Sequence, residues 1–213
     1  MNTRNTAQWI AVILIIPAGA CGSTIFANSV RIYSGDFNLQ IPADSDGSQG
    51  WMADAVIEIP DDFTIHDLDV GITLTHTNVF DLQIFLQNPS GTTRICLNMY
   101  DFKNDFSVRP NYTNTIFDDE AEVPIEDADS PFTGRFRPFE LYQLSEFDGE
   151  QTAGLWRLQI LDRFYADTGT LNHFELVITT PEPTTAIFLL LGTGLLCLHK
   201  HRSPISSKQN GYR

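Results

Sequence analysis

Apolar and polar residues alternate along the middle of the chain, and this alternation predicts β-strands. A period of two places successive side chains on opposite faces of a strand, so that one face can be buried while the other meets water. Turn-forming segments rich in Gly, Asp, Asn and Pro separate the runs, as at 43–50, 88–92 and 147–154. The alternating runs lie at 68–74, 82–86, 95–97, 156–160 and 174–178, with earlier strands expected at 37–41 and 54–59.

Helical periodicity is not convincing in any stretch. Seven or more short strands with turn signals between them predict an all-β fold. The expected architecture is an antiparallel β-sandwich of jelly-roll or related type.

The first 27 residues have the layout of a secretory signal peptide. One basic residue, Arg4, precedes an apolar run from Trp9 to Ile16, and small residues follow. The run is too short for a membrane span and suits a signal peptide instead. Cys21, which follows Ala-Gly-Ala, also permits a lipid-modified N-terminus.

A proline-flanked acidic residue, an apolar run and a basic cluster follow one another near the other end. Pro181, Glu182 and Pro183 precede the apolar residues 186–198, after which come Lys200 and Arg202. Thirteen apolar residues are marginal for a bilayer core of about 30 Å, which needs about 20. Basic residues beside such a segment are expected to stay on the cytoplasmic side.

Residues 181–202 resemble the PEP-CTERM sorting tail of Gram-negative bacteria. The resemblance implies cleavage near Pro181-Glu182-Pro183 by an exosortase-type enzyme and at least transient contact with the membrane. A polar tail, 203–213, continues beyond the basic residues, which departs from the usual pattern. A plain C-terminal anchor is the alternative. Either interpretation predicts an exported protein, located in the cell envelope or the extracellular matrix of a Gram-negative bacterium.

The region between the two ends is strongly acidic. It holds 26 of the 27 acidic residues but only 8 of the 13 basic ones, a net charge of −18 over residues 28–180. A domain with this charge repels nucleic acid and favours cations or basic partners. Apolar and aromatic residues throughout the region predict a folded domain, with no nucleic-acid partner.

Cysteine usage excludes a zinc site and an internal disulfide in this region. The three cysteines are Cys21, Cys96 and Cys197, and only Cys96 lies between the ends. Paired cysteines at metal-binding spacing are absent. Cys96 is therefore expected to be a small packed side chain in a strand.

Five blocks, in order, resemble the P domain, or Homo B domain, of kexin- and furin-like proprotein convertases. The resemblance covers about residues 36–180 and implies a β-sandwich that accompanies and stabilises a subtilisin-type protease domain without taking part in catalysis. Where convertases often carry Arg-Gly-Asp-Leu, this chain has Val79-Phe80-Asp81-Leu82. The blocks are "LTHTNVFDLQIFLQNPSGT", "NTIFDDEA", "SPFTGRFRP", "LSEFDGEQTAGLWRLQILD" and "DTGTLNHFEL".

The chain is not expected to be an enzyme. A convertase needs Asp, His and Ser in one site, and the motifs that carry them in the protease domain do not occur here. Asp167-Thr168-Gly169 is shared with two protease families, but its place between two predicted strands indicates a turn. The histidines His66, His76 and His173 are scattered through strand segments and are expected to be structural.

An acidic loop raises the possibility of a calcium site. Seven carboxylates lie in the twelve residues from Asp118 to Asp129. Calcium takes about six to eight oxygen ligands, and carboxylates from the matched blocks could converge to supply them. The candidate ligands are Asp118, Asp119, Asp81, Asp162 and Asp167. The alternative, a solvated loop that opposes aggregation, stays open.

The favoured hypothesis is an exported, non-catalytic P-domain module that binds or stabilises another macromolecule. The partner is unknown and could be a subtilisin-like protease. One alternative is an accessory subunit of a split subtilisin-like serine protease, acting in trans. Another is a structural component of an exopolysaccharide matrix.

Overall fold

The computed structural model describes residues 6–8, 28–42, 50–99, 108–139, 141–164 and 167–181. The chain divides into two units, residues 1–181 and 182–213, and every described residue lies in the first. Pro181 is the last described residue, so Glu182, Pro183, Lys200, Arg202 and the tail 203–213 lie outside the described part. No helix among the described residues is long and apolar enough to cross a membrane.

Within the described ranges, eleven strands form two sheets, which confirms the predicted all-β sandwich. The larger sheet has the order β1-β2-β11-β5-β8-β9. Its strands are β1 (Thr6–Gln8), β2 (Asn28–Ile41), β5 (Asp67–Thr75), β8 (Tyr112–Phe117), β9 (Phe132–Phe136) and β11 (Gly169–Pro181). Thus β1 lies within the predicted signal peptide and pairs with β2.

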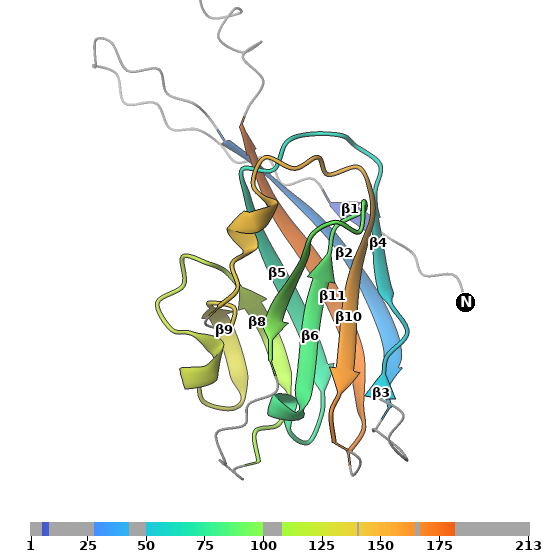
Figure 1. The fold of residues 1–213 in the computed structure, drawn as a ribbon, viewed down its shortest axis with the longest axis vertical. Coiled ribbons are helices and arrows are strands. Elements are labelled where there is room, and N and C mark those ends of the chain that lie inside the picture. Colours follow the sequence, from blue (N-terminus) through green and yellow to red (C-terminus); the bar gives the residue numbers. More distant parts are fainter. Residues whose placement is uncertain are drawn as a thin grey trace, which may run out of the picture. The chain divides into compact units, whose positions relative to one another are not determined.

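The smaller sheet has the order β3-β10-β6-β7, and β4 also pairs with β10. In Figure 1, β6 and β10 of this sheet lie over β5 and β11 of the larger sheet. Its strands are β3 (Gly50–Trp51), β4 (Ala55–Ile59), β6 (Leu82–Gln87), β7 (Arg94–Asn98) and β10 (Gly154–Asp162). Three short 3₁₀ helices lie in connections: η1 (Val79–Asp81), η2 (Ile125–Asp127) and η3 (Leu144–Phe147).

The strand pairing is antiparallel with one exception. The last pair of the larger sheet, β8 with β9, is parallel, within a sandwich that is otherwise antiparallel as predicted. A parallel pair needs a long connection, because the chain must return to the same end before it pairs again. Here the acidic segment 118–131, which includes η2, makes that return.

The core lies between the two sheets and follows from the alternation in the sequence. In β10, the side chains of Trp156, Leu158 and Ile160 are fully buried, while the intervening residues are more exposed. The ring of Trp156 packs edge-on against that of Phe147, with 5.2 Å between the ring centroids. Its indole N–H donates to the carbonyl of Thr152 at 2.8 Å. Removing a buried Trp side chain of this kind typically costs about 3–5 kcal/mol.

Candidate functional site

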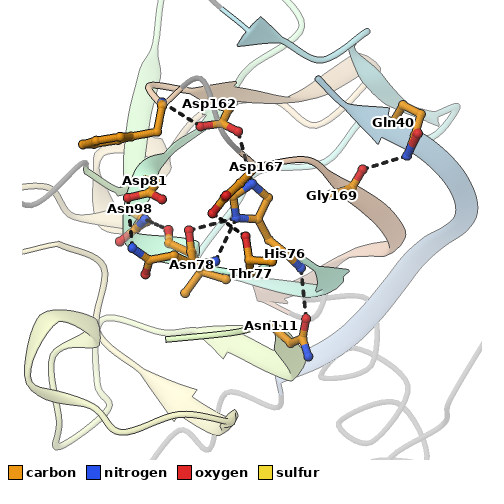
Figure 2. A network of polar contacts seen from close by, with 12 residues as sticks. Gln40, His76, Thr77, Asn78, Asp81, Asn98, Asn111, Asp162, Asp167 and Gly169 are labelled. Atoms are coloured by element: carbon orange, nitrogen blue, oxygen red, sulfur yellow. Dashed lines mark hydrogen bonds and ion pairs between the residues drawn. The ribbon is translucent and has the colours of Figure 1, made fainter. Parts of the chain in front are cut away.

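Four titratable side chains meet at one end of the sandwich, where β5 passes into η1 and where β10 connects to β11. His76 follows β5, and Asp81 ends η1. Asp162 is the last residue of β10, and Asp167 precedes β11. Figure 2 shows their side chains pointing toward one another. We call this group the His76 cluster (His76, Asp81, Asp162, Asp167).

His76 lies at the centre of the cluster, and its side chain and that of Asp162 are both fully buried. Its Nδ1 lies 2.8 Å from the carbonyl oxygen of Asn78, and its Nε2 lies 3.2 Å from Oδ2 of Asp162. The backbone N–H of Asn78 also donates to Nδ1, at 3.2 Å. Nδ1 can therefore accept this N–H or donate to the carbonyl, whereas Nε2 must donate to the carboxylate of Asp162. The arrangement therefore suits the charged imidazolium and also the neutral ring that carries its proton on Nε2.

The charge of Asp162 controls the protonation of His76. Burial by itself lowers the pKa of His76, because a charged ring loses its hydration. The hydrogen bond and the charge of Asp162 outweigh burial, so that the pKa of His76 is raised above its ordinary value. The second oxygen of Asp162, Oδ1, accepts the backbone N–H of Phe164 at 2.9 Å.

The charged form of Asp81 is less well stabilised by its neighbours than that of Asp162. Only 9% of Asp81 is exposed, and its Oδ1 accepts one hydrogen bond, from the amide of Asn78 at 3.0 Å. Burial, followed by the charges of Asp162 and Asp167, raises the pKa of Asp81 to about 6, and His76 opposes the shift only in part. Asp81 therefore holds its proton up to about pH 6, well above the usual range of an aspartate.

Polar neighbours fix the loops that carry the cluster. The amide of Asn98, on β7, donates to the carbonyls of Val79 and Leu82 at 3.1 and 2.7 Å. The side chain of Asn111 accepts the backbone N–H of His76 at 2.9 Å. The bond between His76 and Asn111 appears in Figure 2. Together the three bonds tie the cluster to neighbouring segments.

Gly169 is required where β11 passes the cluster. A Cβ atom at this position would lie 2.4 Å from the carbonyl oxygen of Thr75 and 2.6 Å from Cδ2 of His76. Any side chain would therefore displace the backbone or the imidazole. An open pocket of about 390 Å³ adjoins this contact, lined by Gln40, Thr75, His76, Thr77, Pro110, Asn111, Thr168, Gly169 and Thr170.

The His76 cluster lacks the geometry of nucleophilic catalysis. A hydroxyl nucleophile must be hydrogen-bonded to the base that takes its proton. The neighbouring hydroxyl, on Thr77, donates to Asp167 instead. Asp167 and Thr168 lie in the connection between β10 and β11, as predicted, whereas Gly169 of the same stretch already begins β11.

The cluster also does not fit a calcium ion in the geometry observed. Calcium needs about six to eight oxygens directed at one point. Both oxygens of Asp162 accept N–H groups, one oxygen of Asp81 accepts an amide, and Asp167 accepts a hydroxyl. Among the described residues, no three His, Cys, Asp or Glu side chains are arranged to hold a metal ion.

The other two predicted ligands, Asp118 and Asp119, lie after β8 and do not join the His76 cluster. Asp118 is only 6% exposed and pairs with the guanidinium of Arg135 on β9, which also pairs with Asp69. The Oδ1 atom of Asp118 accepts the backbone N–H of Glu120 at 2.8 Å. We call this group the Arg135 cluster (Asp69, Asp118, Glu120, Arg135).

Arg135 makes the charged form of Asp118 stable. Burial disfavours the charge, but the hydrogen bonds from Arg135 and from Glu120 outweigh it, so the pKa of Asp118 lies below its ordinary value. Burial raises the pKa of Asp69 to about 6, and Arg135 offsets only part of that shift. The sequence pattern did not point to Arg135 or to Asp69 as members of a site.

Asp119 has a structural role at the start of η3. Its two carboxylate oxygens accept the backbone N–H groups of Leu144 and Ser145 at 2.9 and 2.8 Å. The first N–H groups of a helical turn have no partner within the turn, so a carboxylate there satisfies them. The carboxylate of Asp119 is therefore already committed to the fold.

Cys96 is buried with 1% exposure, as predicted, and its thiol donates to the carbonyl of Asn98 at 3.1 Å. Burial raises the pKa of Cys96 to about 12. The thiolate, which is the reactive form, is therefore scarce at neutral pH.

The fold and these sites define a β-sandwich whose polar clusters stabilise its loops. A family model described as the proprotein convertase P-domain matches residues 65–178. The match covers more than half of the chain, and the chain belongs to this family. The P domain is a non-catalytic accessory domain of proprotein convertases.

Solved structures of one bacterial protease resemble the chain. The serine protease of Aeromonas sobria in complex with its chaperone is 17% identical, with a TM-score of 0.44, and the match covers 75% of this chain. The same protease alone is 18% identical, with a TM-score of 0.42 and 76% coverage. The match spans only 28% of each protease chain. A comparison with curated proteins found no match.

Proposed function

We propose that the protein is an exported, non-catalytic P-domain module that binds or stabilises another macromolecule. One observation carries this proposal: the match to the P-domain model spans the sandwich from before β5 to near the end of β11. The described polar clusters support the same view, since their carboxylates and hydroxyls bond to neighbouring groups of the fold rather than to one another as acid, base and nucleophile.

The export part of the proposal rests on the sequence alone. It places the chain at the envelope or in the extracellular matrix, after signal-peptide removal and sorting through Pro181-Glu182-Pro183 by an exosortase-type enzyme. Antibody detection in fractions of the native culture tests it. We expect the chain in the envelope or matrix fraction, and substitution of Glu182 by Ala should leave it at the membrane with its tail uncleaved.

The binding part is tested by cross-linking the native culture before purifying the full chain. A partner cross-linked at defined residues and in stoichiometric amount is the expected result. If the chain is recovered without a cross-linked partner and is not found in the envelope or matrix, the proposal fails.

A second function is supported by the family itself, whose members accompany proteases. In it, the chain is an accessory subunit of a split subtilisin-like serine protease and acts in trans. The test has two parts: whether a neighbouring reading frame encodes a subtilisin-like domain, and whether the full chain prolongs that protease's half-life. No change in half-life on adding an equimolar amount of chain would exclude this function.

A further inference from the structure

The outer face of the smaller sheet carries an exposed aromatic residue beside an arginine. Trp51, on β3, is 42% exposed. Phe85, on β6, points to the outer face because its neighbours Ile84 and Leu86 are in the core. Arg94 begins β7, which pairs with β6. We call these three residues the aromatic–arginine patch (Trp51, Phe85, Arg94).

The three side chains form one unit. The ring centroids of Trp51 and Phe85 are 6.2 Å apart. The guanidinium carbon of Arg94 lies 3.8 Å from the centroid of Phe85 and 5.5 Å from that of Trp51. Contact with an aromatic face attracts a guanidinium and limits its rotation. The cation is therefore held in place at an exposed surface.

Arg94 differs from most arginines of the domain in its partners. Arg31, Arg135 and Arg157 pair with carboxylates, and Arg137 donates to two backbone carbonyls. Within the described residues, the guanidinium of Arg94 contacts the two rings but makes no hydrogen bond or ion pair. Burial lowers the pKa of Arg94, as expected for a charge whose hydration is only partly replaced.

An unpaired, oriented guanidinium is a receptor for a carboxylate. Its five N–H donors lie in one plane and match a carboxylate with two parallel hydrogen bonds. The domain around it has a net charge of −18, so a positive group without an internal partner is unusual. At physiological salt the screening length is about 8 Å, so the distant acidic residues weaken such contact only modestly.

Polar groups beside the patch suit a ligand rich in hydroxyls. Asp54 accepts the amide of Gln159 at 3.2 Å and pairs with Arg157 at 3.5 Å. Its carboxylate is close enough to Arg94 for its charge to act on that residue. A hydroxyl can donate to Asp54, whereas a second carboxylate would be repelled. This pairing favours a ligand in which each carboxylate stands among several hydroxyls over a polyacidic peptide.

We propose that the aromatic–arginine patch binds a saccharide that carries a carboxylate, such as a uronic-acid unit of a polysaccharide. The carboxylate pairs with Arg94, and the apolar face of a sugar ring packs against Trp51. Hydroxyls of the ligand donate to the carboxylate of Asp54. This inference rests on the proposed binding function and assigns it a class of partner.

The test measures binding of trigalacturonate to the full chain by titration calorimetry, at pH 7 and 150 mM salt. Saturable binding is expected, with at least a tenfold loss of affinity in Arg94→Gln and in Trp51→Ala. Arg163→Gln is the matched control, because Arg163 is exposed and, within the part of the chain that the structure describes, its side chain forms no hydrogen bond, ion pair or ring contact. It should bind as the unchanged chain does.

The ligand has a matched control as well. The methyl ester of trigalacturonate keeps the rings and hydroxyls but lacks the charges, and should bind at least tenfold more weakly. Arg94→Lys keeps the charge without the planar donors and should lie between Arg94→Gln and the unchanged chain. Thermal melts of every variant verify that it is folded.

The patch also allows an optical readout. Trp156 is fully buried, whereas Trp51 is exposed, so ligand binding should shift the emission of the unchanged chain to shorter wavelength. The shift should be absent from Trp51→Phe.

Several results would overturn the inference. These are no binding up to 10 mM ligand, equal binding by the ester, equal loss in Arg163→Gln, or equal affinity for penta-glutamate. A chain that binds no trigalacturonate but still cross-links to a protein partner would refute the saccharide while leaving the proposed function intact.

Discussion

The His76 cluster and the Arg135 cluster contain the same kind of side chain in opposite electrostatic conditions. Asp81 and Asp118 are both less than a tenth exposed. A permanent cation and a backbone N–H hold the pKa of Asp118 low, whereas Asp81 faces two other carboxylates and an imidazole, and its pKa rises to about 6. Burial alone therefore does not decide whether a carboxylate stabilises the fold; its charged neighbours do.

The largest effect is expected from Asp162, whose two oxygens hold His76 and the backbone N–H of Phe164. Asp162→Ala should lower the free energy of unfolding by about 3 kcal/mol, because it leaves buried donors unpaired. Urea unfolding of the full chain at pH 6 measures this loss. Asp162→Asn keeps the shape and should lose less. Equal losses in the two variants would show that charge, not hydrogen bonding, dominates.

Removal of the Arg135 side chain should cause the second-largest loss of stability. Arg135→Met leaves Asp69 and Asp118 buried without their cation, at a cost of about 2 kcal/mol at pH 7, reduced because the guanidinium is half exposed. Denaturant unfolding at pH 7 and pH 4 measures it, and the loss should shrink at pH 4 as Asp69 is protonated. Arg163→Gln is the control and should change the stability by less than about 0.5 kcal/mol.

One substitution should have opposite effects in the two clusters. Asp118→Asn removes a favourable charge and should lower the stability at pH 7 by about 1 kcal/mol, whereas Asp81→Asn removes an unfavourable one and should raise it by a similar amount. Paired urea titrations of the two variants measure the difference. The comparison fails if both variants change the stability in the same direction.

The pH dependence of the two clusters follows from the same pKa shifts. The carboxyl of Asp81 ionises near pH 3.9 in the unfolded chain and at about 6 in the folded one. The folded state therefore binds more protons in this window, and its contribution to stability falls as the pH rises.

The contribution of His76 to stability also falls as the pH rises, but in a higher pH range. The raised pKa of His76 stabilises the fold below about pH 6.5, and this contribution is lost as the pH rises through the folded value. Asp118 has the opposite pH dependence, because its contribution to stability is lost as the pH falls below the ordinary pKa range of an aspartate. In Asp81→Asn the decline in stability between pH 4 and 6 should be shallower, which unfolding curves across that range would test.

The smallest effect is expected from calcium. A site that binds at about 10⁻⁴ M would stabilise the chain by about 2.3 kcal/mol in 5 mM calcium, and so raise its melting temperature by about 5–9 °C. Because the predicted ligands bond to other groups of the fold, we expect a shift below about 1 °C between chelator and calcium. A shift of the larger size, absent from a variant with Asn at 118 and 119, would establish the site.

The alternation of apolar and polar residues was sufficient to predict most of the sheet. The strands at 68–74, 82–86 and 156–160 lie within β5, β6 and β10. They were predictable because burial of one face of a strand imposes a period of two on its apolar residues. The strands β8 and β9 were not predicted as strands. They are the last two strands of the larger sheet, and the pattern is interrupted there by residues such as Asn114 and Gly134 with positive φ angles.

The candidate site was predictable only in part. The sequence showed which carboxylates were available, and it placed Asp81, Asp162 and Asp167 near strand ends. It did not show that these three meet, because β6 and β10 are adjacent in the sheet but about 75 residues apart along the chain. The pairing of Arg135 with Asp118 depends in the same way on the parallel contact of β8 with β9.

Residue types and their spacing thus determined the fold class, the family and the strong acidity of this domain, since these depend on local pattern and composition. The tertiary structure alone decided which charges are stabilised and which are not. It placed a guanidinium beside Asp118, an imidazole beside Asp162, and two aromatic rings rather than a carboxylate beside Arg94. The physical reason is that electrostatic energy depends on distances across strands, and these are absent from the linear order of the chain.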